Sequence, residues 1–116
     1  MSVAAFQAAV QNGFNNFANF TGRSSRAEFW LWILFVVLLQ VAVNIVGSIA
    51  PTVGMLLNLG MIVLVVPEVA YGVRRMHDID KSGWWIIVPL YSLYLALQPG
   101  TPGTNRFGDP SPASAM

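Results

Sequence analysis

Residues 27–50 read AEFWLWILFVVLLQVAVNIVGSIA and form a long apolar stretch. This stretch carries one charged residue, Glu28, near its start, and Pro51 follows it. A helix needs about 20 residues, at about 1.5 Å each, to cross a hydrocarbon core of about 30 Å. The sequence therefore predicts a membrane-spanning helix over residues 27–49.

Two further apolar runs follow along the chain. Residues 52–73 have the length of a span, although Pro67 and Glu68 interrupt them. Residues 83–98 are shorter, would reach only about 24 Å as a helix, and contain Pro89 near their centre. A short span that thins the bilayer is the interpretation we favour for this third run, and a re-entrant segment is the alternative.

Composition agrees with a membrane protein. Hydrophobic residues make up 55% of the 116 residues and charged residues 9%, whereas about a quarter of a soluble domain is charged. The net charge of +1, with no basic face, argues against a nucleic-acid partner. The chain has no cysteine, which excludes disulfides and thiolate catalysis.

The segments on either side of the apolar runs differ in character. Apolar residues recur at helical spacing over about residues 3–19, with Gln and Asn between them, although Gly13 weakens the helix. This pattern predicts an amphipathic helix in the membrane interface, packed against the bundle. Residues 99–116 are rich in Pro, Gly and Ser and predict an irregular, mobile tail. The expected fold is all-α: an integral membrane helical bundle over residues 1–98, with this interfacial helix and three transmembrane helices.

Basic residues set the expected orientation. The segments before the first span and between the second and third spans fall on the same side of the membrane, and residues 48–53 on the other side are uncharged. The positive-inside rule then places the N-terminus and the loop of residues 74–81 in the cytoplasm. Three spans would leave the tail outside, and a re-entrant third segment would keep it inside. The basic residues concerned are Arg23, Arg26, Arg74, Arg75 and Lys81.

Two charged motifs flank the spans. GRSSRAEFW, residues 22–30, has the Ser25–Glu28 spacing of a helix capping box. The alternative is an ion pair of Glu28 with Arg75, or else Arg74, which we expect at the same depth at the end of the second span. RRMHDIDKSGWW, residues 74–85, contains the only histidine of the chain. Together they predict one polar network at the level of the cytoplasmic headgroups. Its expected members are Arg23, Arg26, Glu28, Glu68, Arg74, Arg75, His77 and Asp78.

Two roles are open for this network. Its charges neutralise one another and pin the helices together, which we favour, or its arginine forks bind anionic lipid headgroups. Glu68 lies inside the second span, so we expect it to pair with an arginine; a proton or ion site is the alternative. The sequence has no G-x-S-x-G nucleophile motif and no recognised metal-ligand spacing. We therefore expect neither catalysis nor a cofactor.

Three amide side chains lie deeper in the apolar runs. Gln40 and Asn44 are four residues apart on the first predicted span, and Asn58 falls at the same depth on the second. Such residues form hydrogen bonds between helices in a membrane. We expect the three to contact one another and to be shielded from lipid.

The two motifs, with GTPGTNRFGDP at residues 100–110, resemble those of a widespread family of small bacterial inner-membrane proteins, the domain of unknown function 805 family. The resemblance covers nearly the whole chain. It implies an integral protein of the bacterial inner membrane and supplies no activity. The third apolar segment looks shorter here than is usual in that family.

The residues therefore favour a non-catalytic interaction or assembly module in the membrane. Its expected partners are the lipid bilayer, including anionic lipids, and other membrane proteins or further copies of the same chain. The alternative is a subunit of an oligomeric channel or transporter, because three short helices cannot enclose a pore alone.

Overall fold

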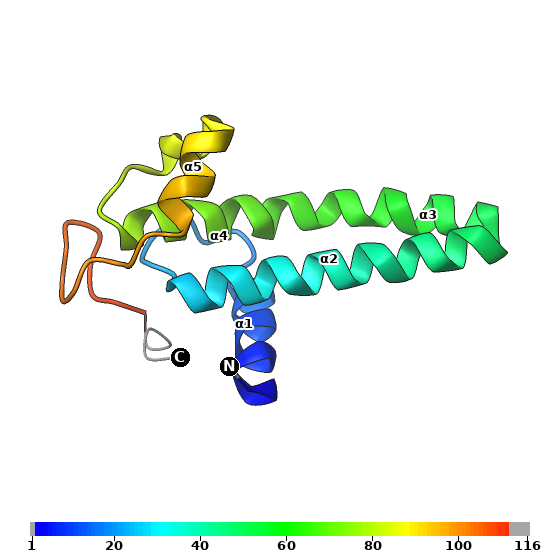
Figure 1. Cartoon of the computed structure of the whole chain (residues 1–116), viewed down its shortest axis with the longest axis horizontal. Coiled ribbons are helices and arrows are strands. Elements are labelled where there is room, and N and C mark those ends of the chain that lie inside the picture. Colours follow the sequence, from blue (N-terminus) through cyan, green and yellow to red (C-terminus); the bar gives the residue numbers. More distant parts are fainter. Residues whose placement is uncertain (1, 112–116) are drawn as a thin grey trace.

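The structure is a computed structural model that describes residues 2–111, and these residues are helical or irregular with no strand. The prediction of an all-α fold is confirmed. Figure 1 shows α2 lying antiparallel to a second long rod, made of α3, η1 and α4. The elements are α1 (Val3–Asn15), α2 (Arg26–Ile49), α3 (Pro51–Met61), η1 (Ile62–Leu64), α4 (Val65–Asp78), η2 (Gly83–Ile87) and α5 (Pro89–Ala96).

The two long rods form a hairpin with the dimensions of a membrane-crossing pair. α2 has 24 residues and the rod Pro51–Asp78 has 28, and both are apolar enough to cross a bilayer. Only 17% of the most apolar stretch of each rod is buried, whereas the core helix of a soluble protein is mostly covered. The predicted span 27–49 matches α2. The predicted span 52–73 lies within the second rod, whose helix continues beyond it through Asp78.

Small residues allow the two rods to approach closely near the turn of the hairpin. A Cβ placed on Gly54 of α3 would lie 2.3 Å from the Cα of Gly47 on α2. Backbones that approach this closely are typical of helix pairs in membranes, where packing and not the hydrophobic effect holds helices together. The turn itself is short because Pro51 occupies the first position of α3, where its missing N–H costs nothing.

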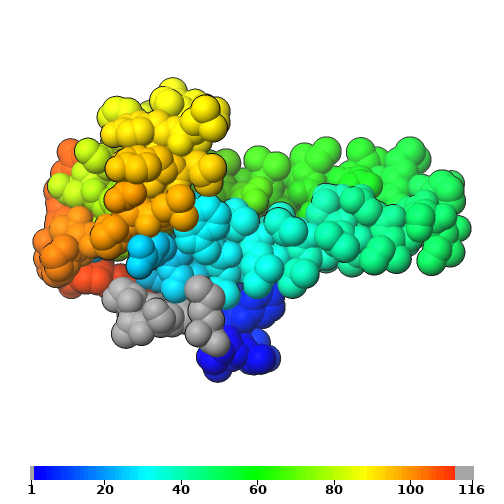
Figure 2. All heavy atoms as spheres, viewed as in Figure 1, coloured from blue at the N-terminus to red at the C-terminus, as the bar shows by residue number. Residues whose placement is uncertain are grey.

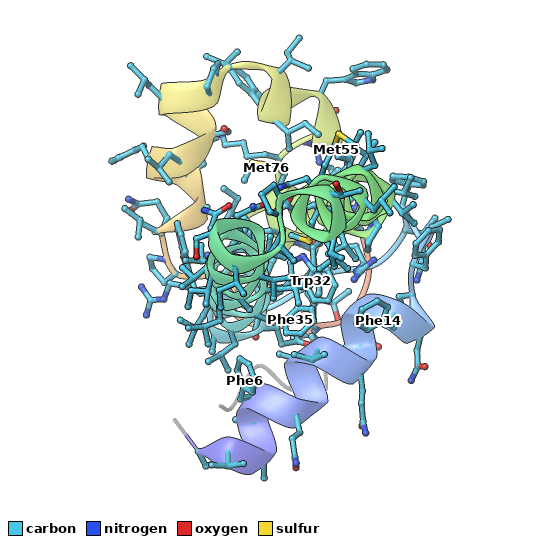
Figure 3. The ribbon with its side chains drawn as sticks, turned by 90° about the vertical axis from the view of Figure 1, so that its right-hand side faces the viewer. Phe6, Phe14, Trp32, Phe35, Met55 and Met76 are labelled. Carbon is cyan, nitrogen blue, oxygen red and sulfur yellow. The ribbon has the colours of Figure 1, made fainter. Side chains whose placement is uncertain are left out.

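At the other end of the hairpin, α1 and the η2–α5 segment pack on opposite sides (Figure 3). Both lie roughly across the hairpin axis in Figure 1. The contact of α1 is aromatic: the ring of Phe14 meets those of Trp32 and Phe35 of α2 at centroid distances of 5.4 and 5.9 Å, and Trp32 is fully buried. Gly13 lies against the six-membered ring of this indole. The glycine that weakens the helical pattern of α1 is therefore the residue at which α1 comes close to Trp32 of α2.

We expect Gly13→Ala to lower the free energy of unfolding by about 1–3 kcal/mol, because overpacking a filled contact forces side chains to move. The added Cβ would lie 2.3 Å from Cζ3 of Trp32. Gly60→Ala is the matched control, since a Cβ at Gly60 meets nothing within 4 Å. Unfolding by SDS in mixed micelles measures both variants. Equal stabilities of the two would contradict the packing of α1 on Trp32.

The third predicted span is not confirmed. Residues 83–98 contain the five-residue 3-10 helix η2, a break at Val88, and the eight-residue helix α5. Proline disfavours a helical residue before it, and Val88 is accordingly extended, with φ −103° and ψ 91°, ahead of Pro89. α5 is about 12 Å long, well short of a hydrocarbon core. The segment bends back beside α4 and does not continue as one rod (Figure 1).

The tail is irregular but closely held up to residue 109. The Thr101 amide donates to the carbonyl of Asp78 at 2.7 Å, and the side chain of Asn105 donates to the carbonyl of His77 at 2.9 Å. The prediction of a mobile extension over 99–116 took no account of these contacts. Residues 112–116 of that extension lie outside the described part of the chain.

Candidate functional site

The charged residues of the two motifs converge on one buried carboxylate, that of Asp78 at the end of α4. Its Oδ1 accepts a hydrogen bond from Nε of Arg23 at 3.0 Å, and its Oδ2 accepts one from Nη1 of Arg75 at 2.6 Å. The three side chains are at most 5% exposed. One carboxylate thus joins α4 to the segment that precedes α2, with two cations around it.

Arg23 uses all of its five N–H donors within the protein. Besides the bond to Oδ1 of Asp78, Nη2 donates to the Asp78 carbonyl at 3.3 Å and to that of Thr101 at 2.5 Å. Nη1 donates to the carbonyls of Gly103 and Gly108 at 2.6 and 3.2 Å. Both glycines have positive φ, +70° and +114°, which lets the tail turn its carbonyls toward the guanidinium. Arg23 therefore fastens the tail to α4.

Arg75 fastens α5 in the same way. Its side chain is fully buried, and Nε donates to the carbonyl of Ala96 at 3.2 Å, while Nη2 donates to that of Gln98. These carbonyls lie at the C-terminal end of α5, where a helix leaves acceptors unpaired and favours a cation. The predicted pairing of Arg75 with Glu28 or Glu68 is therefore wrong. Its partners are Asp78 and the end of α5.

Arg74 points to the other side and fastens α1. Its guanidinium stacks over the ring of Tyr71 at 4.7 Å and donates to Oγ of Ser24 at 3.0 Å. Its remaining bonds go to the end of α1 and the turn after it: the carbonyls of Asn19 and Asn16, at 2.7 and 3.1 Å, and Oδ1 of Asn12 at 3.2 Å. Adjacent residues on a helix point about 100° apart, so Arg74 and Arg75 secure opposite flanks of α4.

Glu28 closes a capping box at the start of α2. Its Oε1 accepts from the Ser25 amide at 2.9 Å, and its own amide donates to Oγ of Ser25 at 3.2 Å. Within residues 2–111 its carboxylate forms no ion pair. Of the two roles that the sequence left open for Glu28, the structure has the cap.

His77 is a structural contact between α4 and the tail. Its Nδ1 lies 2.9 Å from the Gly22 carbonyl, and its ring stacks on Phe107 at a centroid distance of 3.9 Å. Ser25 and Ser82 accept hydrogen bonds from nearby backbone amides, and neither bonds to His77 in the described residues. A Ser–His contact is one arrangement that activates a nucleophile, and it is not among the contacts of residues 2–111.

Two predicted members of the network lie apart from it. Arg26 is exposed and makes one hydrogen bond, from Nη1 to the Leu97 carbonyl at 3.1 Å. Glu68 lies nearly three turns before Asp78 and, in residues 2–111, makes neither a hydrogen bond nor an ion pair. The other six residues of the predicted set meet at one end of the hairpin.

The three amides of the hairpin contact one another as predicted. The Nε2 of Gln40 donates to Oδ1 of Asn44 at 3.2 Å and to Oδ1 of Asn58 at 2.9 Å. The expectation that they are buried is wrong, because Asn44 and Asn58 are exposed. The three form a polar strip on the open face of the hairpin.

The features that sequence reasoning missed are backbone acceptors. The carbonyls of Thr101, Gly103 and Gly108 bind Arg23, and those of Ala96 and Gln98 bind Arg75. A carbonyl leaves no mark in the sequence, since every residue has one. The glycines of the tail were the only available signal.

Fold and contacts together define a small helical membrane protein with an apolar hairpin. At one end of this hairpin, four buried charged residues fasten the neighbouring segments to α4, and we call them the clamp: Arg23, Arg74, Arg75 and Asp78. The chain belongs to the family described as protein of unknown function DUF805, whose sequence profile matches residues 17–109. That match runs from the end of α1 through the clamp and into the tail.

Similar proteins carry names that agree with this class. The inner membrane protein YhaH of Escherichia coli K12 is 32% identical over 105 residues, covering 80% of this chain and 87% of YhaH. The inner membrane protein YhaI of the same strain is also 32% identical over 105 residues, covering 81% of this chain and 86% of YhaI. No solved structure matches the chain. These names state a location and no activity.

Proposed function

We propose that the protein is a non-catalytic assembly module of the bacterial inner membrane, which associates with a second copy of itself through its hairpin. The observation that carries this proposal is the polar strip of Gln40, Asn44 and Asn58. These amides lie on an exposed face of two apolar helices, at a depth where lipid offers no hydrogen-bond partner. Figure 2 shows this end of the hairpin projecting without cover from other elements on the face in view.

The strip has both donors and acceptors to spare. Gln40 uses both N–H groups of its amide inside the hairpin, which leaves its Oε1 open as an acceptor within the described residues. The Nδ2 of Asn44 donates to nothing in the same residues. Since the two amides lie 3.2 Å apart, a copy related by a two-fold axis could bond Nδ2 of Asn44 to Oε1 of Gln40 in both directions.

Orientation is part of the proposal. All six Lys and Arg residues lie outside the apolar part of the hairpin, and the turn at Ala50 carries no charge. The positive-inside rule supports a cytoplasmic clamp. The bonds from Arg23 to the tail support placing residues 99–109 on that same side, with two crossings in place of three. α1 and η2–α5 would then lie at the cytoplasmic interface.

Cysteine crosslinking in native membranes tests the association, because the chain has no cysteine of its own. Val37 and Leu38 are 52% and 53% exposed, and on a helix they point about 100° apart. Val37 lies beside the polar strip and Leu38 lies away from it. We expect Val37→Cys to give a crosslinked dimer and Leu38→Cys to give much less.

Asn44→Leu in the Val37→Cys background should lower the dimer fraction. Two reciprocal interhelical hydrogen bonds are worth about 1–2 kcal/mol together, which corresponds to about a 5- to 30-fold weaker association. Crosslinking of Val37→Cys and Leu38→Cys to the same extent, or no effect of Asn44→Leu, would contradict association through this strip.

We propose contact with anionic lipid for fewer arginines than the sequence suggested. Arg23, Arg74 and Arg75 spend most or all of their donors on the protein, so little remains for a phosphate. Arg26 is exposed and keeps four of its five N–H groups free within the described residues. It borders a cavity of about 710 Å³ between Trp30 and the tail. We expect Arg26→Gln to reduce binding to vesicles containing phosphatidylglycerol more than any change to the clamp that leaves the fold intact.

The alternative, a subunit of an oligomeric channel or transporter, has one observation in its favour. Glu68 is a carboxylate inside the second apolar rod that has no ion pair among the described residues, and such groups occur along ion pathways. Two crossing helices cannot enclose a pore, so this function needs a ring of copies. Ion flux through liposomes that contain the crosslinked Val37→Cys oligomer, and its loss in Glu68→Gln, would favour transport over assembly.

A further inference from the structure

A groove with apolar walls lies at the junction of α4, η2 and α5, away from the clamp. Its volume is about 410 Å³, and it is lined by Phe29 of α2, Val65 and Met76 of α4, Ile86 of η2 and Leu93 of α5. η2 and α5 are joined by the extended residue Val88, and the groove lies between this bent segment and α4. Gly72 adds no side chain to the floor, and its nearest neighbour there is Ile86.

Glu68 is the one ionisable residue in this lining. Its side chain is partly buried and, in residues 2–111, has no hydrogen bond or ion pair. The hydroxyl of Ser92, also in the groove, donates to the Pro89 carbonyl at 3.0 Å and not to Glu68. The nearby arginines are committed to the clamp. The carboxylate is therefore unmatched by anything in the described chain.

The position of Glu68 indicates which kind of ligand the groove could hold. It lies ten residues before Asp78 on the same rod, about 15 Å from Asp78 along the helix axis. A carboxylate at that depth is costly unless a cation accompanies it. The apolar walls around it, with the aromatic ring of Phe29, suit the body of a molecule that carries such a cation.

We propose that this groove is a binding site for an organic cation with an apolar body, its charged centre beside Glu68 and its hydrocarbon along the groove walls. Charge complementarity selects the cation, and the largely apolar lining selects a molecule soluble in the membrane. Two sources share this chemistry: a free lipophilic cation and the ammonium group of a phosphatidylethanolamine lipid. The proposal does not depend on the self-association proposed above.

Tetraphenylphosphonium, titrated calorimetrically into protein in phosphatidylcholine nanodiscs, tests the site. We expect saturable binding at one cation per chain, at least tenfold weaker in Glu68→Gln. Triphenylphosphine oxide, a neutral molecule of similar shape, should bind at least tenfold more weakly than the cation. Repeating the titration in phosphatidylethanolamine nanodiscs separates the sources. Competition by that lipid would assign the site to the lipid amine, and unchanged binding would assign it to a free cation.

Two further variants keep the result interpretable. Asp80→Asn removes a carboxylate from the exposed Arg106 pair and suits the positive φ of 62° at that position, so it should bind like the parent. Glu68→Asp keeps the charge and should retain binding better than Glu68→Gln. Glu68 makes no hydrogen bond or ion pair within residues 2–111, so both Glu68 variants should unfold like the parent. No saturable binding by the parent, equal binding by Glu68→Gln, or equal binding of the neutral molecule would overturn the proposal.

Discussion

Asp78→Asn should lower the free energy of unfolding by about 3–5 kcal/mol, because removing one partner of a buried ion pair leaves an uncompensated charge. Here two buried arginines lose their counter-charge at once, since Arg23 and Arg75 bond to opposite oxygens of the same carboxylate. Asparagine has the same shape, so the loss reports charge and hydrogen bonding and not packing. Unfolding in SDS mixed micelles measures the change.

Asp80→Asn is the control for that experiment. Asp80 pairs with Arg106 at 3.2 Å, but the two side chains are 46% and 61% exposed, and exposed pairs contribute at most about 1 kcal/mol. We expect the loss in free energy of unfolding to be much larger for Asp78→Asn than for Asp80→Asn. Losses of the same size at the two positions would mean that burial of the clamp has no energetic consequence.

Arg23→Lys should release the tail. Lysine keeps the charge but carries its three donors on a single nitrogen, so it cannot bond to Asp78 and to the carbonyls of Thr101, Gly103 and Gly108 together. Hydrogen bonds from a charged donor are worth about 1.5–3 kcal/mol each, and loss of one therefore raises the open population of the tail at least tenfold. Trypsin cleavage after Arg106, followed by mass spectrometry, measures that population.

Arg26→Lys is the matched substitution for the tail experiment. Arg26 lies three residues away, is exposed, and makes one hydrogen bond, to the Leu97 carbonyl. It should leave cleavage after Arg106 within about twofold of the parent, since surface substitutions change stability by about 0.5 kcal/mol or less. A tail that is cleaved equally fast in the parent and in Arg23→Lys would show that Arg23 does not hold it.

The hairpin and the place of the clamp were predictable because they follow from solvation. Apolar runs of membrane length and a capping box at Ser25–Glu28 are local patterns, and all six Lys and Arg residues lie outside the apolar part of the hairpin. The mutual contact of Gln40, Asn44 and Asn58 was predictable for the same reason, since amides in an apolar helix pair satisfy one another.

The pairing inside the clamp was not predictable from local pattern. Arg75 was expected to meet Glu28 because the two lie at the same depth on neighbouring helices. Instead, Arg75 pairs with Asp78, three residues further along α4. The carboxylate of Glu28 accepts a hydrogen bond from the Ser25 amide and caps its own helix. Which of several reachable carboxylates an arginine takes depends on tertiary contacts that periodicity does not record.

The third apolar run shows the limit of a hydropathy argument. Residues 83–98 have the composition of a short span, but Ser82 caps a 3-10 turn and Pro89 forces a break at Val88. Arg75 then holds the far end of α5 beside α4. The sequence of residues 83–98 allowed a short span or a re-entrant segment. The hydrogen bond from Arg75 to the end of α5 is a tertiary contact that hydropathy does not record.

The clamp leaves most of the hairpin uncovered by the rest of the described chain. Three buried arginines fasten three different segments to α4: α1 by Arg74, the tail by Arg23 and α5 by Arg75. All three attachments lie at one end of the hairpin, so the polar strip at its other end stays uncovered by the described chain. The clamp residues lie apart from the polar strip and leave it exposed.

We propose that the buried charges of the clamp stabilise one another and do not bind an outside ligand. A double-mutant cycle of Arg75→Gln and Asp78→Asn tests it most directly, with the free energy of unfolding in mixed micelles as the readout. The two side chains meet at 2.6 Å, so the double variant should be more stable than the sum of the single losses predicts, by about 1–3 kcal/mol. Additivity within about 0.5 kcal/mol would show that the two charges do not depend on each other, and would contradict the clamp.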